Sequence, residues 1–484
     1  MMKILGVLLF TLTLFGAEKP NIILFYVDDF GVNDLSCNGS TFYETPHMDQ
    51  LAADGVKFIN AYTAFPRCLP ARQALLTGKY PSRFDVQPYP KQHLPFEEVT
   101  FGEALKEGGY ETSYIGKWHL GHKGQDPGKQ GFDHVVHSGH AGATKSFFYP
   151  FPVEKGHSVE NPVKGKEGDY LTDVLRDEAC EFIKSKADKP FLLVMAHYAV
   201  HTPLEGRPDL VEKYRKKLKE MGLSEGGHSD DADIVRDKTG MHKTIQNNPH
   251  YAALIESVDT SLGKIMQTLK DLKIDDNTII ILSADHGGLS SRGLNNKRPL
   301  ATTNAPYRQG KGWTYEGGIR VPHIVKWPGK IKAGTVSTVQ TIGTDHYPTM
   351  LEVAGLKLKP EQHIDGRSYL KALKGEDYQR DGMFWYSHTA RPDSTGDTRG
   401  MAYTEGKYKI HEWFDEESLE LYDLENDPGE QNDLSKQMPE KAKELHDKML
   451  TIEASIGNYR KQGLRSTQKR LEKKNKSKKK PKKN

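Results

Sequence analysis

The sequence has 484 residues, about two to three times the usual length of one domain, so we expect one large domain with a smaller companion. Hydrophobic residues make up 36% and charged residues 27%, which excludes a disordered, a collagen-like or a multi-span membrane chain. The net charge of +3 hides an uneven distribution, because ten Lys or Arg and only one Glu lie from Lys469 to Asn484. The body of the chain is therefore mildly acidic, and we expect no nucleic-acid partner.

The first residues have the pattern of a secretory signal. Lys3 precedes an apolar run from Ile4 to Phe15, and the small residues Gly16 and Ala17 follow it. The run is shorter than the roughly 20 apolar residues that cross a bilayer. We therefore predict a signal peptide over residues 1–17, export to the periplasm or the medium, and no stable insertion in a membrane.

Strand-like and helix-like segments alternate after this leader. Continuous apolar and β-branched runs at Asn21–Val27, Phe191–Ala196 and Thr278–Ala284 are typical of strands that are buried on both faces. Apolar residues spaced by three and four predict a helix over Tyr251–Leu272. This alternation predicts an α/β sandwich on a largely parallel sheet over residues 18–370, with its ligand site at the carboxyl ends of the strands.

The remaining segments are more polar. Residues 205–250 are expected to cross the surface, and short alternating strands predict a small α+β domain over residues 371–465. The lysine-rich tail over residues 466–484 is expected to be disordered. Such a tail either binds an anionic polysaccharide or a membrane surface, or only keeps the protein soluble.

Cys68 begins the most distinctive stretch of the chain. Residues 68–78 read Cys-Leu-Pro-Ala-Arg-Gln-Ala-Leu-Leu-Thr-Gly. Pro70 suits the first turn of a helix and Gly78 its end, which predicts Cys68 at an anion-attracting helix N-terminus with Arg72 one turn further on. Three cysteines in an exported chain leave at least one thiol to explain. The alternative is a buried structural thiol.

Acidic residues follow two of the predicted strands. Asp28 and Asp29 close the first strand, and Asp285 and His286 close the strand that ends at Ala284. Because parallel strands end at one edge of a sheet, these pairs are expected to converge. Their carboxylates are the hard oxygen ligands that Ca²⁺ prefers, whereas a histidine is less typical of a calcium site.

A second motif, Gly-Lys-Trp-His-Leu-Gly, occupies residues 116–121. If this stretch is extended, Lys117 and His119 point to one side and Trp118 to the other, so both polar side chains can face an anion. The alternative is a buried tryptophan between charges that lie on a solvated face.

Two further basic residues stand in recognisable positions. His201 lies just beyond the strand that ends at Ala196, whereas we assign the nearby His197 a structural role. Lys311 precedes Gly-Trp-Thr-Tyr-Glu-Gly-Gly-Ile-Arg, in which Glu316 and Arg320 are expected to hold the turn rather than to touch a substrate.

In this order, over residues 21–322, these motifs resemble those of the type I sulfatases of the alkaline phosphatase superfamily. Segments 420–424 and 427–430 are similar to the end domain of that family. The resemblance implies an alkaline phosphatase-like α/β/α sandwich on a large, mostly parallel sheet, with a smaller C-terminal α+β domain. This chain has Ala71 where the most common form of the motif has Ser, and His286 where many members have Asn.

The resemblance also implies a mechanism. A maturation enzyme oxidises Cys68 to formylglycine, whose hydrate binds the cation and attacks sulfur. His119 then deprotonates the second hydroxyl, and His201, alone or with Lys311, protonates the leaving oxygen. The implied catalytic residues are Cys68, Arg72, Lys117, His119, His201 and Lys311. The implied ligands of one calcium ion are Asp28, Asp29, Cys68, Asp285 and His286.

The function that we predict is an exported sulfatase that acts on a sulfated carbohydrate. The form of the Lys311 motif is similar to that of sulfatases acting on galactose-type sugars. The alternatives are a phosphate or phosphonate monoester hydrolase and a non-catalytic binder of sulfated glycans with an unconverted Cys68. A cysteine-based phosphatase is disfavoured, because its loop needs about five residues between Cys and Arg whereas three stand between Cys68 and Arg72.

A group of rings and hydrogen-bond donors follows the Lys117 motif. These residues either contact the faces and hydroxyls of a sugar or form the core of a buried loop. They are His134, His137, His140, Phe147, Phe148 and Tyr149.

Overall fold

The computed structural model describes most of the chain after the predicted leader. The described residues are 19–84, 93–121, 124–226, 233–237, 239–461, 463, 464 and 468. The predicted signal peptide over residues 1–17 and the predicted tail, apart from Gln468, lie outside them. Within the described ranges, no helix is both long enough and apolar enough to span a bilayer.

An eight-stranded mixed sheet forms the centre of the molecule, in the order β11-β2-β10-β8-β1-β5-β3-β4. Its strands are β1 (Asn21–Val27), β2 (Val56–Tyr62), β3 (Glu111–Gly116), β4 (His134–Val136), β5 (Phe191–Ala196), β8 (Thr278–Ala284), β10 (His323–Lys326) and β11 (Thr335–Ile342). Strand β10 is antiparallel to both neighbours, and the other pairs are parallel. The predicted bounds of β1, β5 and β8 are confirmed.

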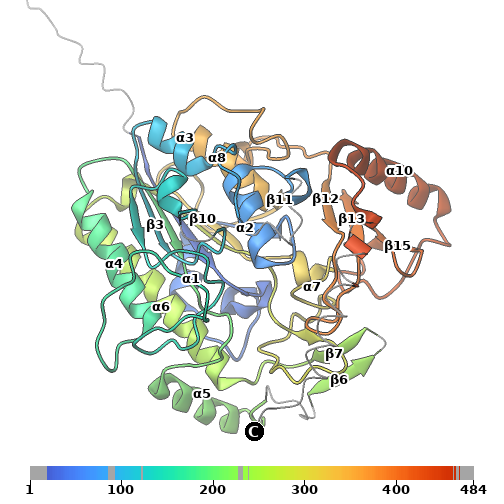
Figure 1. The fold of residues 1–484 in the computed structure, drawn as a ribbon, viewed down its shortest axis with the longest axis horizontal. Coiled ribbons are helices and arrows are strands. Elements are labelled where there is room, and N and C mark those ends of the chain that lie inside the picture. Colours follow the sequence, from blue (N-terminus) through green and yellow to red (C-terminus); the bar gives the residue numbers. More distant parts are fainter. Residues whose placement is uncertain are drawn as a thin grey trace, which may run out of the picture.

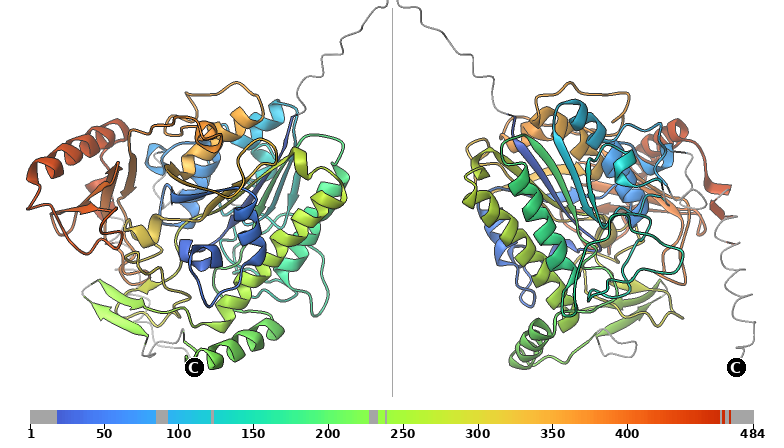
Figure 2. Two further views of the ribbon diagram at one scale, coloured as in Figure 1. Left: turned by 180° about the vertical axis from the view of Figure 1, so that it is seen from behind. Right: turned by 60° about the vertical axis from the view of Figure 1, so that its left-hand side comes forward.

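Helices cover both faces of this sheet (Figures 1 and 2). Alternate residues of β1 enter different cores: Ile23 and Phe25 lie in one, and Ile22 and Leu24 in the other. The first core includes side chains of α1 (Pro46–Ala53), α4 (Leu171–Ser185), α5 (Pro208–Glu220) and α6 (Pro249–Asp271). The second includes α2 (Cys68–Thr77), α3 (Phe101–Glu107), α8 (His346–Val353) and α9 (Leu370–Leu373). The predicted α/β/α sandwich is confirmed.

The polar segment 205–250 is more ordered than a surface crossing. Helix α5 buries Val211, Tyr214 and Leu218, and it packs against α6. A small three-stranded sheet follows, made of β6 (Ile234–Asp237), β7 (Gly240–Lys243) and β9 (Ser291–Arg292). Most residues of the segment are polar, so its composition did not indicate the apolar face of α5.

A second sheet lies beside the large one, to the right in Figure 1. It is antiparallel, in the order β12-β13-β14-β15, and one long helix packs on it. These elements are β12 (Met383–Ser387), β13 (Gly400–Glu405), β14 (Tyr408–Trp413), β15 (Ser418–Asp423) and α10 (Pro439–Ile456). This is the predicted small α+β unit, and its boundary at residue 370 stays a prediction.

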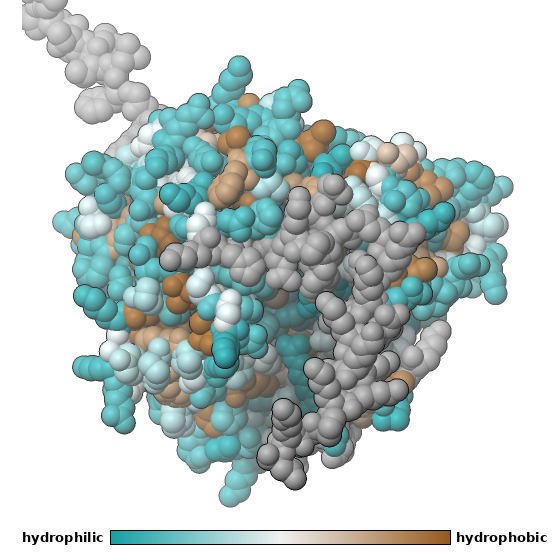
Figure 3. Space-filling model, in the orientation of Figure 1, coloured by the Kyte–Doolittle hydropathy of each residue, from teal (hydrophilic) through white to brown (hydrophobic). Residues whose placement is uncertain are grey.

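Short elements complete the connections. Helix α7 (Glu316–Ile319) lies between the large and the small sheet. The short 3-10 helices are Val32–Asp34, Ser36–Asn38, Pro81–Arg83, Pro127–Lys129, Asp275–Asn277 and Gly343–Asp345. The face of the molecule drawn in Figure 3 is mostly hydrophilic, with hydrophobic residues scattered over it.

Candidate active site

Parallel strands bring the predicted ligands of the cation, and Lys117, to one edge of the large sheet. Asp28 and Asp29 directly follow β1, Asp285 and His286 follow β8, and Lys117 follows β3. Because β1 pairs in parallel with β8 and β5, and β5 with β3, the carboxyl ends of these strands lie together. These five residues are at most 1% exposed.

Helix α2 brings Cys68 to the same edge. The helix begins at Cys68 and ends at Gly78, which caps it in the left-handed conformation, as predicted. One turn after Cys68, Arg72 Nη2 donates to Asp285 Oδ2 at 3.0 Å and Nη1 donates to the Lys117 carbonyl at 2.8 Å. The N-terminus of α2 is thereby tied to the ends of β8 and β3.

The donor atoms at this edge form a cluster of the kind that binds a cation. Asp28 Oδ1 and Asp29 Oδ2 are buried and have no hydrogen-bond partner among the described residues. Burying an unsatisfied carboxylate oxygen is costly, so this donor set fits a divalent cation that takes oxygen ligands. Two overlapping groups have their ligand atoms within 4.8 Å of one another: Asp28, Cys68, Asp285 and His286, and Asp28, Asp29, Cys68 and His201.

His286 directs its ring nitrogen Nε2 into this cluster. Its Nδ1 lies 3.0 Å from the Gly287 carbonyl, where it can only donate, so Nε2 of the neutral ring is an acceptor. Nε2 lies 3.2 Å from both Cys68 Sγ and Asp29 Oδ1. Burial opposes protonation, but the charges of Asp285, Cys68 and Asp29 outweigh it and raise the pKa of His286. A proton and a cation therefore compete for Nε2.

Two buried lysines face the carboxylates. Lys117 Nζ donates to Asp28 Oδ2, and Lys311 Nζ donates to Asp29 Oδ1 at 2.5 Å and lies 3.5 Å from Cys68 Sγ. Burial disfavours the charged form of Lys311, but Asp29 and Cys68 outweigh burial and raise its pKa. Lys311 is therefore a fixed positive charge next to residue 68.

The surroundings of Cys68 stabilise negative charge at the position of its sulfur. Burial by itself raises the pKa of the thiol, but Lys117, Lys311 and His286 outweigh burial and hold that pKa well below its usual value. The amides at the start of α2 act in the same direction. An anionic nucleophile and an anionic substrate group both suit such a place.

The two histidines beyond β5 differ in their surroundings. His201 Nδ1 donates to the Thr202 carbonyl at 2.7 Å, which directs Nε2 towards Asp29 Oδ2 at 3.9 Å. Burial lowers the pKa of His201 to about 3, so the ring is neutral before substrate binds. His197 is fully buried and hydrogen-bonds Ser261 through Nε2, which fits the structural role expected of it.

The backbone of the Gly-Lys-Trp-His motif is not extended throughout, so the condition that we set for Lys117 and His119 to share one side is not met. Strand β3 ends at Gly116, whose φ is +95° and where an added Cβ would lie 2.1 Å from the Ala196 carbonyl oxygen. His119 also has a left-handed φ of +64°. Lys117 and His119 nevertheless reach the site, because the turn redirects both, and Trp118 is fully buried in the core.

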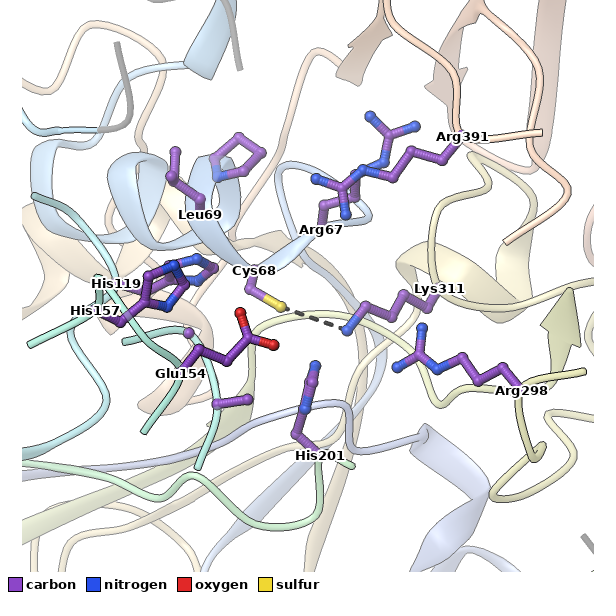
Figure 4. Close-up of a pocket in the computed structure, with 13 residues that line it drawn as sticks. Arg67, Cys68, Leu69, His119, Glu154, His157, His201, Arg298, Lys311 and Arg391 are labelled. Carbon is purple, nitrogen blue, oxygen red and sulfur yellow. Dashed lines mark hydrogen bonds between the residues drawn. The ribbon is translucent and has the colours of Figure 1, made fainter. Parts of the chain in front are cut away.

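A cleft of about 260 Å³ opens above Cys68. In the view of Figure 4, His119 and His157 lie on one side of the thiol and Lys311 on the other, with His201 facing it from below. The cleft is lined by Arg67, Cys68, Leu69, Pro70, His119, Gly142, Ala143, Glu154, His157, His201, Arg298, Lys311 and Arg391.

Five polar residues of this lining belong to no motif that the sequence revealed. They are isolated polar residues in loops, where neither periodicity nor spacing marks them. Arg391 comes from the loop between β12 and β13, so the small sheet contributes to the cleft. The five are Arg67, Glu154, His157, Arg298 and Arg391.

The rings after the Lys117 motif do not line this cleft. His137, His140 and Phe147 are at most 3% exposed, whereas Tyr149 is 45% exposed. The ring of His140 lies 4.9 Å from that of His157, directly behind the cleft wall. Most of the group therefore forms the core of a loop, which was the second of the two expectations.

Contacts with the small sheet hold the loop that carries Lys311 in place. Glu316 accepts hydrogen bonds from Arg320 at 2.8 Å and from Lys409 of β14 at 2.9 Å, and Lys409 also pairs with Glu430 at 3.0 Å. Glu316, Lys409 and Glu430 are fully buried. Glu316 and Arg320 thus hold the turn, as expected.

Comparison with known proteins agrees with this geometry. Residues 20–356 match the family model for sulfatases, and residues 309–455 match the model described as N-sulphoglucosamine sulphohydrolase, C-terminal. The second match covers the loop of Lys311 and the small antiparallel sheet.

Individual relatives extend over most of the chain. An N-acetylgalactosamine-6-sulfatase of Canis lupus familiaris is 35% identical, over 82% of this chain and 72% of that protein. A sulfatase of Formosa agariphila is 30% identical, over 87% of this chain and 85% of the relative. The crystal structure of Ps i-CgsB with k-i-k-neocarrahexaose superposes with a TM-score of 0.73 at 28% identity, covering 90% of this chain and 92% of that one. The chain belongs to the sulfatase family, a family of sulfuric ester hydrolases.

Proposed function

We propose that this chain is an exported sulfatase that releases sulfate from a sulfated sugar, using formylglycine at position 68 and a bound divalent cation. One observation carries the proposal: Cys68 begins helix α2 at the wall of a cleft, next to Lys311, and it adjoins the buried Lys117 and a buried cluster of carboxylates, two oxygens of which have no hydrogen-bond partner among the described residues. That combination suits an anionic ester and a metal-assisted nucleophile.

Cys68 is the residue that we expect a maturation enzyme to oxidise. The hydrated aldehyde supplies a hydroxyl nucleophile and a second hydroxyl through which the sulfated residue can be resolved. Lys117, Lys311 and Arg72 place positive charge around this position. His119 lines the cleft and is neutral because burial lowers its pKa, so it can accept a proton there. We expect His201, alone or with Lys311, to protonate the departing oxygen; Lys311 Nζ already carries a proton, because Asp29 and Cys68 raise its pKa, whereas His201 Nε2 must first take one up.

Asp28, Asp29, Asp285 and His286 are the residues that we expect to hold the cation, with residue 68 as a further ligand. This assignment is supported by Asp28 Oδ1 and Asp29 Oδ2, which have no hydrogen-bond partner among the described residues. Three carboxylates favour calcium, which as a Lewis acid polarises bound oxygen. The imidazole of His286 is the one ligand that also suits softer divalent ions.

We propose a galactose-type sugar, such as N-acetylgalactosamine, as the sulfate carrier. The name of the canine relative and the carrageenan oligosaccharide in the related crystal structure support a sulfated carbohydrate. The leader over residues 1–17 supports export to the periplasm or the medium, where such polysaccharides occur.

Release of inorganic sulfate from several esters tests the proposal. We expect turnover of N-acetylgalactosamine 6-sulfate, galactose 6-sulfate or an aryl sulfate, and a loss of at least about a thousandfold in Cys68→Ala. An aryl phosphate measures the phosphatase alternative in the same assay. A higher kcat/KM for the phosphate than for every sulfate, or unchanged sulfate release by Cys68→Ala, contradicts the proposal.

A further inference from the structure

We propose that Asp397 is a positioning residue for the sulfatase reaction. It lies on the loop between β12 and β13, and it fixes the start of α2 and the loop of Lys311 relative to each other. Cys68 and Lys311 stand 243 residues apart in the sequence, so their mutual placement depends on such tertiary contacts. This inference rests on the proposed function, because it concerns residues that we expect to act on the ester.

Asp397 holds the start of α2 through Arg67. Arg67 is the N-cap residue of that helix, and its carbonyl accepts a hydrogen bond from the Ala71 amide at 3.0 Å. The Arg67 side chain donates to Asp397 Oδ2 and, at 2.9 Å, to the Thr389 carbonyl. Both acceptors lie on the loop between β12 and β13, so this loop restrains the backbone from which Cys68 extends.

The ion pair between Arg67 and Asp397 is buried. Arg67 is 3% exposed and Asp397 is fully buried. A buried carboxylate is costly unless hydrogen bonds satisfy it, and Asp397 also accepts from Thr395 Oγ1 and, at 3.1 Å, from the Arg391 backbone amide. Because water does not compete for these bonds, the carboxylate is held in one arrangement.

The loop of Lys311 packs on the same carboxylate. The next residue, Gly312, has a φ of +102°, and a Cβ added to it would lie 2.8 Å from Asp397 Oδ1 and 2.7 Å from Thr395 Oγ1. Trp313 Nε1 donates to the Thr395 carbonyl at 3.1 Å. Asp397 and Thr395 therefore determine where the backbone next to Lys311 lies.

The two restrained segments also meet directly. The Gly312 amide donates to the Pro66 carbonyl at 2.8 Å, so the residue after Lys311 is bonded to the segment that leads into α2. In the view of Figure 4, the Arg67 and Lys311 side chains lie on the same side of the Cys68 thiol. Asp397 contacts both sides of this junction, so its loss is expected to change the distance between Lys311 and residue 68.

That distance matters for the proposed reaction. The ammonium group of Lys311 stabilises charge on the ester only when it is placed accurately, and a displacement of about 1 Å can cost about a hundredfold in rate. Asp397 does not itself line the cleft. It therefore acts through Lys311 and residue 68 rather than by touching the substrate.

Steady-state kinetics of Asp397→Asn test the inference, with kcat expressed per folded molecule that has been converted at residue 68. The amide keeps the shape of the side chain and removes its charge. We expect kcat to fall about tenfold or more, equally for an aryl sulfate and for N-acetylgalactosamine 6-sulfate, because the change lies at the ester end of the cleft. An unchanged kcat contradicts the inference, and so does a loss confined to the sugar sulfate, which would show that Asp397 acts through the cleft wall.

Asp415→Asn is the matched control. It makes the same chemical change in the turn between β14 and β15, and it breaks an ion pair with Arg399, which is 4% exposed. Neither residue lines the cleft, so kcat should stay unchanged even where the Tm falls. An equal loss of kcat in Asp415→Asn and Asp397→Asn would show only a general effect of stability and would overturn the positioning role.

Thr395→Val carries the test in case Asp397→Asn does not fold. It preserves the shape of a side chain that is 2% exposed and removes the hydroxyl that donates to Asp397. We expect a smaller fall in kcat, about threefold, because Asp397 keeps its charge and its contact with Arg67. A Thr395→Val enzyme with the kcat of the wild type would contradict the inference.

Crystal structures of the unconverted protein separate this inference from the proposed function. They measure the distance between Lys311 Nζ and Cys68 Sγ, 3.5 Å here, without any turnover. We expect this distance to increase by about 1 Å or more in Asp397→Asn and to stay the same in Asp415→Asn. A wild-type enzyme that releases no sulfate would refute the proposed function, whereas an unchanged distance in Asp397→Asn would refute the positioning role.

Discussion

At the scale of single residues, the cation site depends on which atom each side chain presents. Asp28 and Asp29 each present a buried oxygen that has no hydrogen-bond partner among the described residues, whereas His286 presents a nitrogen. The Gly287 carbonyl fixes the tautomer of His286, since only Nδ1–H can donate to it. The identity of residue 286 should therefore tune the choice of metal more than the number of ligands does.

The substitution His286→Asn tests this role. An amide oxygen is a harder ligand than an imidazole nitrogen, so we expect the ratio of zinc affinity to calcium affinity to fall by about tenfold or more. Calorimetric titration of the metal-free protein with each ion measures the ratio. The exposed His47, which lies on α1 away from the site, offers the control His47→Asn, which should leave the ratio unchanged. An unchanged ratio in His286→Asn would remove that residue from the ligand set.

At the scale of elements, α2 is the part that sets the geometry of the site. Its N-terminus carries Cys68, and Gly78 ends it with a φ of +69°. An added Cβ at Gly78 would lie 2.4 Å from His363 Cβ, so the helix end is also packed tightly against the chain after α8. Gly355 has nearly the same φ, +67°, with no atom within 4 Å of such a Cβ.

These two glycines form a matched pair. Gly355→Ala should lower the free energy of unfolding by about 1 kcal/mol, through backbone strain alone. Gly78→Ala adds the clash with His363 and should lower it by about 3 kcal/mol. The midpoints and slopes of urea unfolding give both values. Equal losses would show that the packing of the end of α2 contributes little.

Elements whose sequence has a strong hydrophobic pattern or clear end signals were predictable. Features that depend on the conformation of a single residue, or on a short apolar face in a charged segment, were not. Strands β1, β5 and β8 follow from continuous apolar runs, and the ends of α2 follow from Pro70 and Gly78. The Lys117 motif is not extended, because Gly116 adopts a left-handed φ, and the motif alone does not reveal this conformation. The apolar face of α5 consists of three buried residues in a segment that is otherwise mostly charged. The composition of the segment therefore gave no indication of this face.

At the scale of the whole molecule, the small sheet takes part in the site. It supplies Arg391 to the cleft, and through Lys409 it holds the Glu316 turn that follows Lys311. Sequence patterns predicted this unit but not its contact with the cleft, because the residues involved are isolated in sequence and meet only after folding. The unit is therefore expected to affect catalysis as well as stability.

The substitution Lys409→Met measures this coupling. It leaves the buried carboxylates of Glu316 and Glu430 without their shared lysine, which should cost about 3 kcal/mol or more in unfolding free energy and lower kcat/KM by displacing Lys311. Lys407→Met is the control on the turn that leads into β14, because Lys407 pairs with Asp423 while 40% exposed and should cost less than about 1 kcal/mol. A mutant of Lys409 with the stability and kcat/KM of the Lys407 mutant would show that the two sheets act independently.

Across these scales the site depends on the chemistry of residue 68, and the mass of one peptide tests it most directly. Trypsin cleaves after Arg67 and Arg72, so the peptide that begins at Cys68 reports the state of this residue. We predict that in active protein residue 68 has lost its sulfur and carries an aldehyde, and that sulfate release rises in proportion to the converted fraction. Full activity in protein whose peptide contains only unmodified cysteine would contradict a formylglycine-dependent mechanism.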